Sequence, residues 1–233
     1  MRLVNVRSCV HVPPIGQLPN LKYLRVDGAH AVTKVGPEFV GCKKGDLVCN
    51  ELVAFPILEH LIFMDMPNWE AWSFFDKEVA ADERGDDGAA DIRKADAPSA
   101  RLRLLPRLVK LFLHGCPKLR DLPRQLGKDT ACLKEVNLRG LNNLKAVEDH
   151  PVLSEVLIIG DCEGLERICN LPQVTNLQVR GCLNLSHVEG LGSLQELSLG
   201  EDMQEVSSRW VPGLQEQHRQ LHGEDLDIYT WTR

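Results

Sequence analysis

The chain has 233 residues, of which 43% are hydrophobic and 26% charged, and its formal net charge is −6. It is long enough to bury the core of one domain or two small ones. Its pI of about 5.8 argues against nucleic-acid binding, which needs a basic face. No stretch approaches the ~18 consecutive apolar residues of a membrane span, and residues 1–9 lack the layout of a secretory signal. With eight cysteines but no Cys-x-x-Cys pair, the sequence predicts reduced thiols in the cytoplasm.

Leucine accounts for 35 residues and recurs in a fixed pattern. Around Cys116 the pattern reads L-x-x-L-x-L-x-x-C-x-x-L-x-x-L-P. Variants of it recur along the chain, and the residue equivalent to Cys116 is the anchor of each copy. The eight anchors are Cys9, Ala29, Met66, Cys116, Leu141, Cys162, Cys182 and Asp202. Five of the seven intervals between them are 20 to 25 residues, which is the period of leucine-rich repeats.

In two copies, adjacent apolar residues leave more than one choice of inward-pointing positions. In the first copy, the inward strand positions are predicted to be Val4 and Val6. In the sixth copy, Val156 and Ile158 fit best, one residue out of frame. This offset predicts a one-residue insertion or bulge near Gly160.

Each L-x-L segment is expected to be a short strand whose leucines point inward and whose x residues point outward. Successive strands stack about 4.8 Å apart as a parallel sheet. The predicted fold class is therefore α/β: a leucine-rich repeat solenoid, or horseshoe, with a parallel β-sheet on its concave face, a mostly irregular convex side and a C-terminal helical cap. The anchor cysteines lie where each strand turns, and we expect their S–H groups to meet backbone carbonyls rather than a metal.

Composition divides the chain into four segments. They are residues 1–75 (three repeats, with a loop at about 36–51), 76–100 (an insert), 101–202 (five repeats) and 203–233 (a cap). The insert contains the run DKEVAADERGDDGAADIRKADAP, which is acidic and too poor in bulky apolar residues to order itself. We expect a mobile excursion there, and an acidic partner-docking loop is the alternative.

The cap is predicted from apolar residues at helical spacing, followed by a short last strand over residues 226–231. The predicted buried stripe consists of Val206, Trp210, Leu214, Gln217 and Leu221. The first repeat begins at Met1 without such a cap, so we expect an open apolar edge there unless a neighbouring segment covers it.

Outward strand positions predict where a partner binds. Their central column is predicted to be Asn5, Arg25, Ile62, Phe112, Asn137, Leu157, Gln178 and Ser198. Nothing in the leucine pattern requires apolar residues at these positions, yet Ile62, Met64 and Phe112 would be neighbours. An exposed apolar cluster with an aromatic and basic rim is typical of a protein-binding hot spot. The candidate protein-binding residues are Tyr23, Arg25, Ile62, Met64, Lys110, Phe112, His114 and Arg139. The alternative is that the insert or an upstream domain covers the patch.

Motifs for catalysis or for cofactor binding are not found in the sequence. The G-x-x-x-x-G-K-[S/T] phosphate loop, G-x-S-x-G and H-E-x-x-H are all missing. His218 and His222 lie four residues apart and could form half of a zinc site, but no second pair has suitable spacing, and surface histidines are the simpler interpretation. We therefore expect a non-enzymatic chain that holds no metal or cofactor.

Two passages, PPIGQLPNLKYLRVDGAHAVTKVGPEFVG and FPILEHLIFMDMPNWEAWSF, are more specific than the leucine skeleton. They resemble the leucine-rich repeat region of plant coiled-coil, nucleotide-binding, leucine-rich repeat disease-resistance proteins. The ending LHGEDLDIYTW is similar to the terminus of many cereal members.

The resemblance implies a cytoplasmic recognition and autoinhibitory domain of an immune receptor. Its partners would be a pathogen effector or a guarded host protein, and the receptor's own upstream nucleotide-binding domain, where ADP or ATP would bind. The alternative is the substrate-recruiting subunit of a ubiquitin ligase, which would need an F-box upstream.

Overall fold

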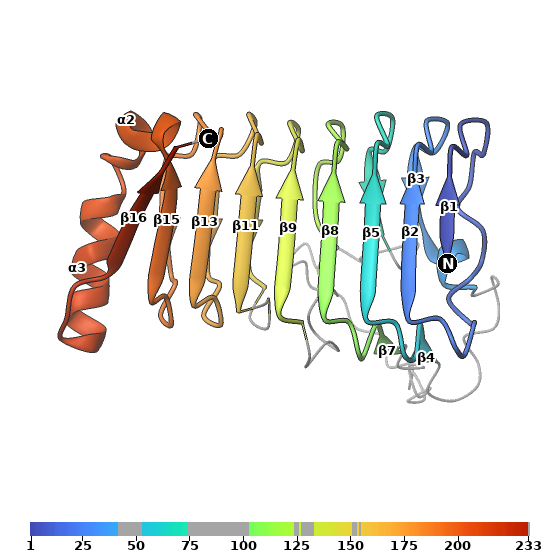
Figure 1. Cartoon of the computed structure of the whole chain (residues 1–233), viewed down its shortest axis with the longest axis horizontal. Helices are drawn as coiled ribbons and strands as arrows, with labels where there is room; N and C mark the ends of the chain where they lie inside the picture. Colours follow the sequence, from blue (N-terminus) through green and yellow to red (C-terminus); the bar gives the residue numbers. More distant parts are fainter. Residues whose placement is uncertain are drawn as a thin grey trace, which may run out of the picture.

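The computed structural model describes residues 1–41, 53–73, 103–123, 126, 133–150, 153 and 155–232. Its main feature is a nine-stranded parallel sheet in the order β1-β2-β5-β8-β9-β11-β13-β15-β16 (Figure 1). The strands are β1 (Arg2–Val4), β2 (Tyr23–Asp27), β5 (His60–Met64), β8 (Lys110–His114), β9 (Glu135–Arg139), β11 (Val156–Gly160), β13 (Asn176–Arg180), β15 (Glu196–Gly200) and β16 (Asp227–Trp231). The chain advances by one strand per repeat, and the predicted α/β solenoid of leucine-rich repeat type is confirmed.

Alternating burial along each strand explains why these segments form a sheet. In β5 and β8 the second and fourth residues are buried, and the others are half-buried. The register is one to one, so Leu61 lies beside Leu111, and Phe63 beside Leu113. All four of these side chains are fully buried. Burying such a side chain contributes about 1.5–3 kcal/mol relative to leaving it exposed, and stacking places every inward leucine on another apolar residue.

The segments that connect successive strands of the main sheet contain short strands and one short helix. The strands are β3 (Lys34–Val35) with β6 (Ala71–Trp72), β4 (Val53–Ala54) with β7 (Arg103–Leu104), and β10 (Ala146–Glu148) with β12 (Arg167–Cys169) and β14 (His187–Glu189). Helix α1 (Pro37–Val40) falls within the loop expected at about 36–51. It forms because Pro37 suits the first helical turn and because Phe39 and Val40 are buried. Residues 42–51 of that loop, and the insert at 76–100, lie outside the described residues.

An aromatic cluster fills the interior of the N-terminal repeats. Phe63 lies 4.9 Å from Trp69 and 5.5 Å from Trp72, between ring centroids, and Phe39 lies 5.9 Å away. Phe55 in turn contacts Phe39. Both tryptophans are core residues, since they are 0% and 5% exposed.

The turn after each of the first seven strands of the main sheet contains a left-handed residue, which is why glycine, aspartate or asparagine recurs there. The residues with positive φ at this point are Asn5, Gly28, Asp65, Gly115, Gly140, Asp161 and Gly181. The anchor cysteine follows directly in three repeats. The thiols of Cys116, Cys162 and Cys182 donate to the carbonyl oxygen two residues earlier, at 3.2–3.5 Å. The expectation that these anchors meet a backbone carbonyl is confirmed.

The predicted frame of the first repeat is wrong. Leu3 pairs with Val26, so Leu3 points inward and Val4 is 51% exposed. The anchor position passes from Cys9 to Val6, which packs against the core. The error arose because Leu3 and Val4 are adjacent apolar residues, and only the sheet register decides which of them faces inward.

The bulge predicted near Gly160 is also absent. Strand β11 runs in unbroken register with β9 and β13, and its inward residues are Leu157 and Ile159. Val156 and Ile158, predicted to be inward, are half-buried on the opposite face. Four consecutive apolar residues satisfy either frame, so the alternation gave no signal at this strand.

The C-terminal cap contains a 3-10 helix, η2 (Glu201–Met203), and the helices α2 (Gln204–Ser207) and α3 (Val211–His222). Of the predicted stripe, Val206, Trp210 and Leu214 are buried. The stripe then continues in steps of four residues to buried His218, while Leu221 is 59% exposed, contrary to prediction.

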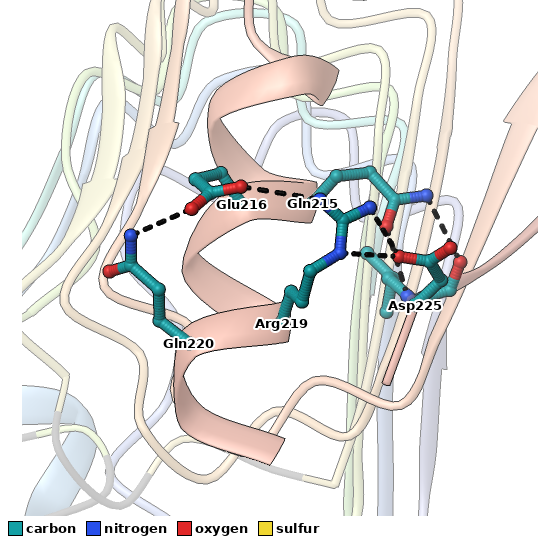
Figure 2. Close-up of polar contacts among 6 residues, drawn as sticks. Gln215, Glu216, Arg219, Gln220 and Asp225 are labelled. Atoms are coloured by element: carbon teal, nitrogen blue, oxygen red, sulfur yellow. Dashed lines mark hydrogen bonds and ion pairs between the residues drawn. The ribbon is translucent and has the colours of Figure 1, made fainter. Parts of the chain in front are cut away.

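Polar contacts join α3 to the turn before β16 (Figure 2). Arg219 donates from Nε to Asp225 Oδ1 at 3.0 Å. The side-chain amide of Gln215 bonds both backbone groups of Leu226: its Oε1 accepts from the N–H at 3.0 Å, and its Nε2 donates to the carbonyl at 3.3 Å. These contacts hold the last strand in place at the end of the sheet.

Candidate protein-binding surface

The first, third and fifth residues of each strand form the face of the nine-stranded sheet that points away from the core, here called the solvent face. Its central column consists of Arg2, Arg25, Ile62, Phe112, Asn137, Ile158, Gln178, Ser198 and Tyr229. Two predicted members are wrong. Leu157 is fully buried, and Asn5 lies beyond the end of β1, where Arg2 pairs with Arg25 instead.

All eight candidate residues lie on the solvent face and are half-buried. The register places Ile62 directly beside Phe112, and Met64 beside His114. The rings of Phe112 and His114 meet edge to face, with centroids 6.2 Å apart. The structure thus brings Ile62, Met64 and Phe112 together as neighbours on adjacent strands.

The rim around this cluster is less basic than its sequence suggests. Arg25 is in a close ion pair with Asp27 on the same strand, which raises the pKa of the guanidinium. Lys110 is in an ion pair with Glu135 on the next strand, at 2.5 Å. Two of the predicted cations are therefore neutralised by neighbours on the same face.

His114 is hydrogen-bonded to Asn137, and its burial favours the neutral form of the ring. Its Nε2 lies 3.0 Å from Oδ1 of Asn137, which is only 6% exposed. Burial lowers the pKa of His114, the hydrogen bond to Asn137 opposes this, and the positive charge of Arg139 lowers it further. At neutral pH this histidine adds a polar ring to the surface but little charge.

Sequence reasoning missed several residues of the same surface. His60 lies beside Tyr23, with ring centroids 6.2 Å apart, and Glu135 neutralises Lys110. Ile158 takes the central place that had been given to Leu157. His60 and Glu135 occupy the first position of their strands, so the alternation of the sequence could have placed them on the solvent face. Ile158 could be placed there only from the hydrogen-bonded register of β11.

The remaining polar groups do not assemble a metal centre where the structure is described. Residues 1–41, 53–73, 103–123, 126, 133–150, 153 and 155–232 hold no group of three His, Cys, Asp or Glu side chains placed for a metal ion. His218 is buried rather than on the surface, and His222 Nε2 lies 2.9 Å from the Gly192 carbonyl. In the same ranges, helices long and apolar enough to cross a membrane are not found.

A separate hollow of about 790 Å³ opens beside the short strands β3 and β6. Its wall is largely apolar, with Val10, Val12 and Pro13 on one side. It lies on the side away from the solvent face and holds none of the candidate residues.

Comparison with known proteins finds similarity over half of the chain. A candidate disease resistance protein of Arabidopsis thaliana is 31% identical over 118 residues, which is 51% of this chain and 6% of that protein. A disease resistance RPP13-like protein 1 candidate of the same plant is 31% identical over 119 residues, 51% of this chain and 9% of that protein. The matched region is thus a small part of either relative. No protein-family profile matches the chain.

Proposed function

We propose that this chain is the protein-recognition and autoinhibitory repeat region of an intracellular plant immune receptor. The observation that carries the proposal is the apolar cluster of Ile62, Met64 and Phe112 on a solenoid whose sequence is similar to plant disease resistance proteins. In this role the chain acts in the cytoplasm by binding, without catalysis.

The apolar cluster supports a binding role because the solenoid does not need it. Inward leucines already form the core, and outward positions of a solvated sheet are normally polar. Side chains held side by side on paired strands lose little further freedom when a partner covers them. A central aromatic residue with apolar neighbours and a polar rim is the arrangement in which a few residues carry most of the binding energy.

The proposed partners are a pathogen effector, or a host protein that it modifies, and the receptor's own nucleotide-binding domain. ADP or ATP would bind in that upstream domain and not in this chain. Contact with the domain in the resting state would restrain it, and recognition would relieve the restraint.

The test is made in the full-length receptor, expressed in leaf tissue and scored for cell death with and without the pathogen. Truncating Phe112→Ala should weaken partner binding by about 2 kcal/mol, or roughly thirtyfold, because it removes the central aromatic side chain. The receptor should then lose its response or become active without pathogen. The matched control is Leu183→Ala, since Leu183 is 59% exposed and lies outside the solvent face. A Phe112→Ala receptor that keeps both normal recognition and normal restraint contradicts the proposal.

A further inference from the structure

The fifth residues of neighbouring strands form a second column on the solvent face, and a glycine interrupts it. Gly160 at the end of β11 lies between Arg139 of β9 and Arg180 of β13. A Cβ placed on Gly160 would lie 3.3 Å from Arg180 Nε and 3.4 Å from Arg139 Cγ. The two arginine side chains therefore approach each other over the bare backbone of Gly160.

The charges of this pair are only half compensated. Arg180 donates from Nη2 to Asp161 Oδ2 at 3.0 Å, whereas no carboxylate among the described residues lies within ion-pair distance of Arg139. The Nε atoms of both arginines are shielded from solvent and have no hydrogen-bond partner within the described ranges. Arg180 is therefore compensated by Asp161, whereas Arg139, on the other side of Gly160, is a cation without a carboxylate partner in the described part of the chain.

The residues paired with Arg139 on the two adjacent strands supply no negative charge. Its neighbour on β8 is His114, and an imidazole carries no negative charge in either protonation state, so it cannot compensate the arginine. The central column beside the site offers neutral side chains, namely Asn137 and Ile158. On the far side of Arg180 the charge is reversed: a small hollow is lined there by Asp161, Glu201, Asp202 and Trp231. Trp231 also stacks under the Arg180 guanidinium at 5.7 Å.

We propose that the Arg139–Gly160–Arg180 site binds a carboxylate side chain, Asp or Glu, of the partner protein. This inference rests on the proposed function and adds the chemistry of the partner. The guanidinium group matches a carboxylate in shape and gives paired, charge-assisted hydrogen bonds. Because Ile158 and Phe112 lie in the adjacent central column, the partner segment carries an apolar residue close to its acidic one.

The test uses a random nine-residue peptide library displayed on phage as the probe. The complete 233-residue chain is immobilised at low density, and peptides are selected on wild type. Their affinities are then measured on Arg139→Gln, Arg139→Lys, Gly160→Ala and Phe112→Ala. The control is Arg167→Gln, because Arg167 is an exposed arginine in an ion pair with Glu148 away from the solvent face. Circular dichroism checks that each variant is folded.

We expect the selected peptides to be enriched in Asp or Glu beside an apolar residue. Their affinity should fall by about tenfold in Arg139→Gln, as for the loss of one charge-assisted hydrogen bond. It should fall less in Arg139→Lys, which keeps the charge, and stay unchanged in Arg167→Gln. Gly160→Ala should weaken binding as well, because its methyl group occupies the gap between the arginines.

Two results overturn the inference, and they differ in what they say about the proposed function. If peptides bind, lose affinity in Phe112→Ala and yet show no acidic preference, the carboxylate site is wrong and protein recognition by the solvent face stands. If no selected peptide depends on Phe112 or on Arg139, both the site and the proposed binding surface fail.

Discussion

The assignment of inward and outward residues makes a direct prediction about two phenylalanines on neighbouring strands. Phe63 on β5 is fully buried, and Phe112 on β8 is half-buried on the solvent face. Replacing each by alanine removes the same atoms from opposite sides of one sheet. The two variants should therefore differ sharply in stability.

The expected magnitudes follow from what each ring touches. Phe63 packs against Phe39, Trp69 and Trp72, and its removal leaves a closed cavity in the aromatic cluster. Such a truncation destabilises a protein by about 3–5 kcal/mol, which for a chain of this size lowers the Tm by roughly 6–20 °C. Truncation of Phe112 opens only onto solvent, so no cavity forms. It should cost about 1 kcal/mol, from the part of the ring that is covered.

The assay is urea unfolding of both variants and wild type, followed by tryptophan fluorescence. Trp69 and Trp72 lie in the perturbed cluster, so this signal reports on the region that is changed. The midpoint should drop strongly for Phe63→Ala and slightly for Phe112→Ala, with similar slopes. Equal destabilisation by the two substitutions would refute the assignment of Phe112 to the solvent face, and with it the binding surface.

Two further predictions test the turns of the solenoid. Gly181→Ala should destabilise the chain by about 1–3 kcal/mol, because φ is +61° there and the new Cβ would lie 2.6 Å from Asp161 Oδ1. The control is Gly192→Ala, whose Cβ meets nothing within 4 Å. Equal urea midpoints for the two variants would contradict the left-handed turn. Burial raises the pKa of the Cys116 thiol to about 12, so at pH 8 only about one molecule in ten thousand carries the reactive thiolate. Iodoacetamide should therefore label the partly exposed Cys9 and spare Cys116 in the folded chain, as measured by peptide mass spectrometry. Prompt labelling of Cys116 would show that the anchor is not buried.

The sequence predicts the fold well because stacking repeats one local rule many times. Each copy independently marks its inward positions, so errors in one copy do not disturb the others. The errors fall where that local rule is degenerate. The Leu3-Val4 pair and the run from Val156 to Ile159 offer apolar residues to both faces, and only the hydrogen-bonded register with the next strand separates the two frames.

The candidate surface is less predictable, because neighbours on it decide the charge of each residue. Arg25 and Lys110 predict a basic rim in the sequence, yet Arg25 is paired with Asp27 on its own strand and Lys110 with Glu135 on the next strand. Sequence spacing gives the strand position of a residue. It does not give the conformation of the long side chains that pair across strands, and this requires coordinates.

Cross-strand pairing also explains which outward residues remain for a partner. On a parallel sheet with exact register, each outward side chain has a neighbour about 4.8 Å away on either side. Where the neighbours are complementary, as Lys110 and Glu135 are, the sheet satisfies them itself. Ile62 and Phe112 lie side by side, and neither Arg25 nor Asn137, their other neighbours in the column, matches them chemically, so apolar surface is left exposed. Arg139 has neutral Gly160 as its neighbour on β11, where a carboxylate would have matched it. The positions on this face without a complementary neighbour are therefore apolar on β5 and β8 and cationic on the next strand, β9. A partner segment that crosses the strands meets both in turn, which is why the apolar cluster and the arginine pair belong to one binding surface rather than two.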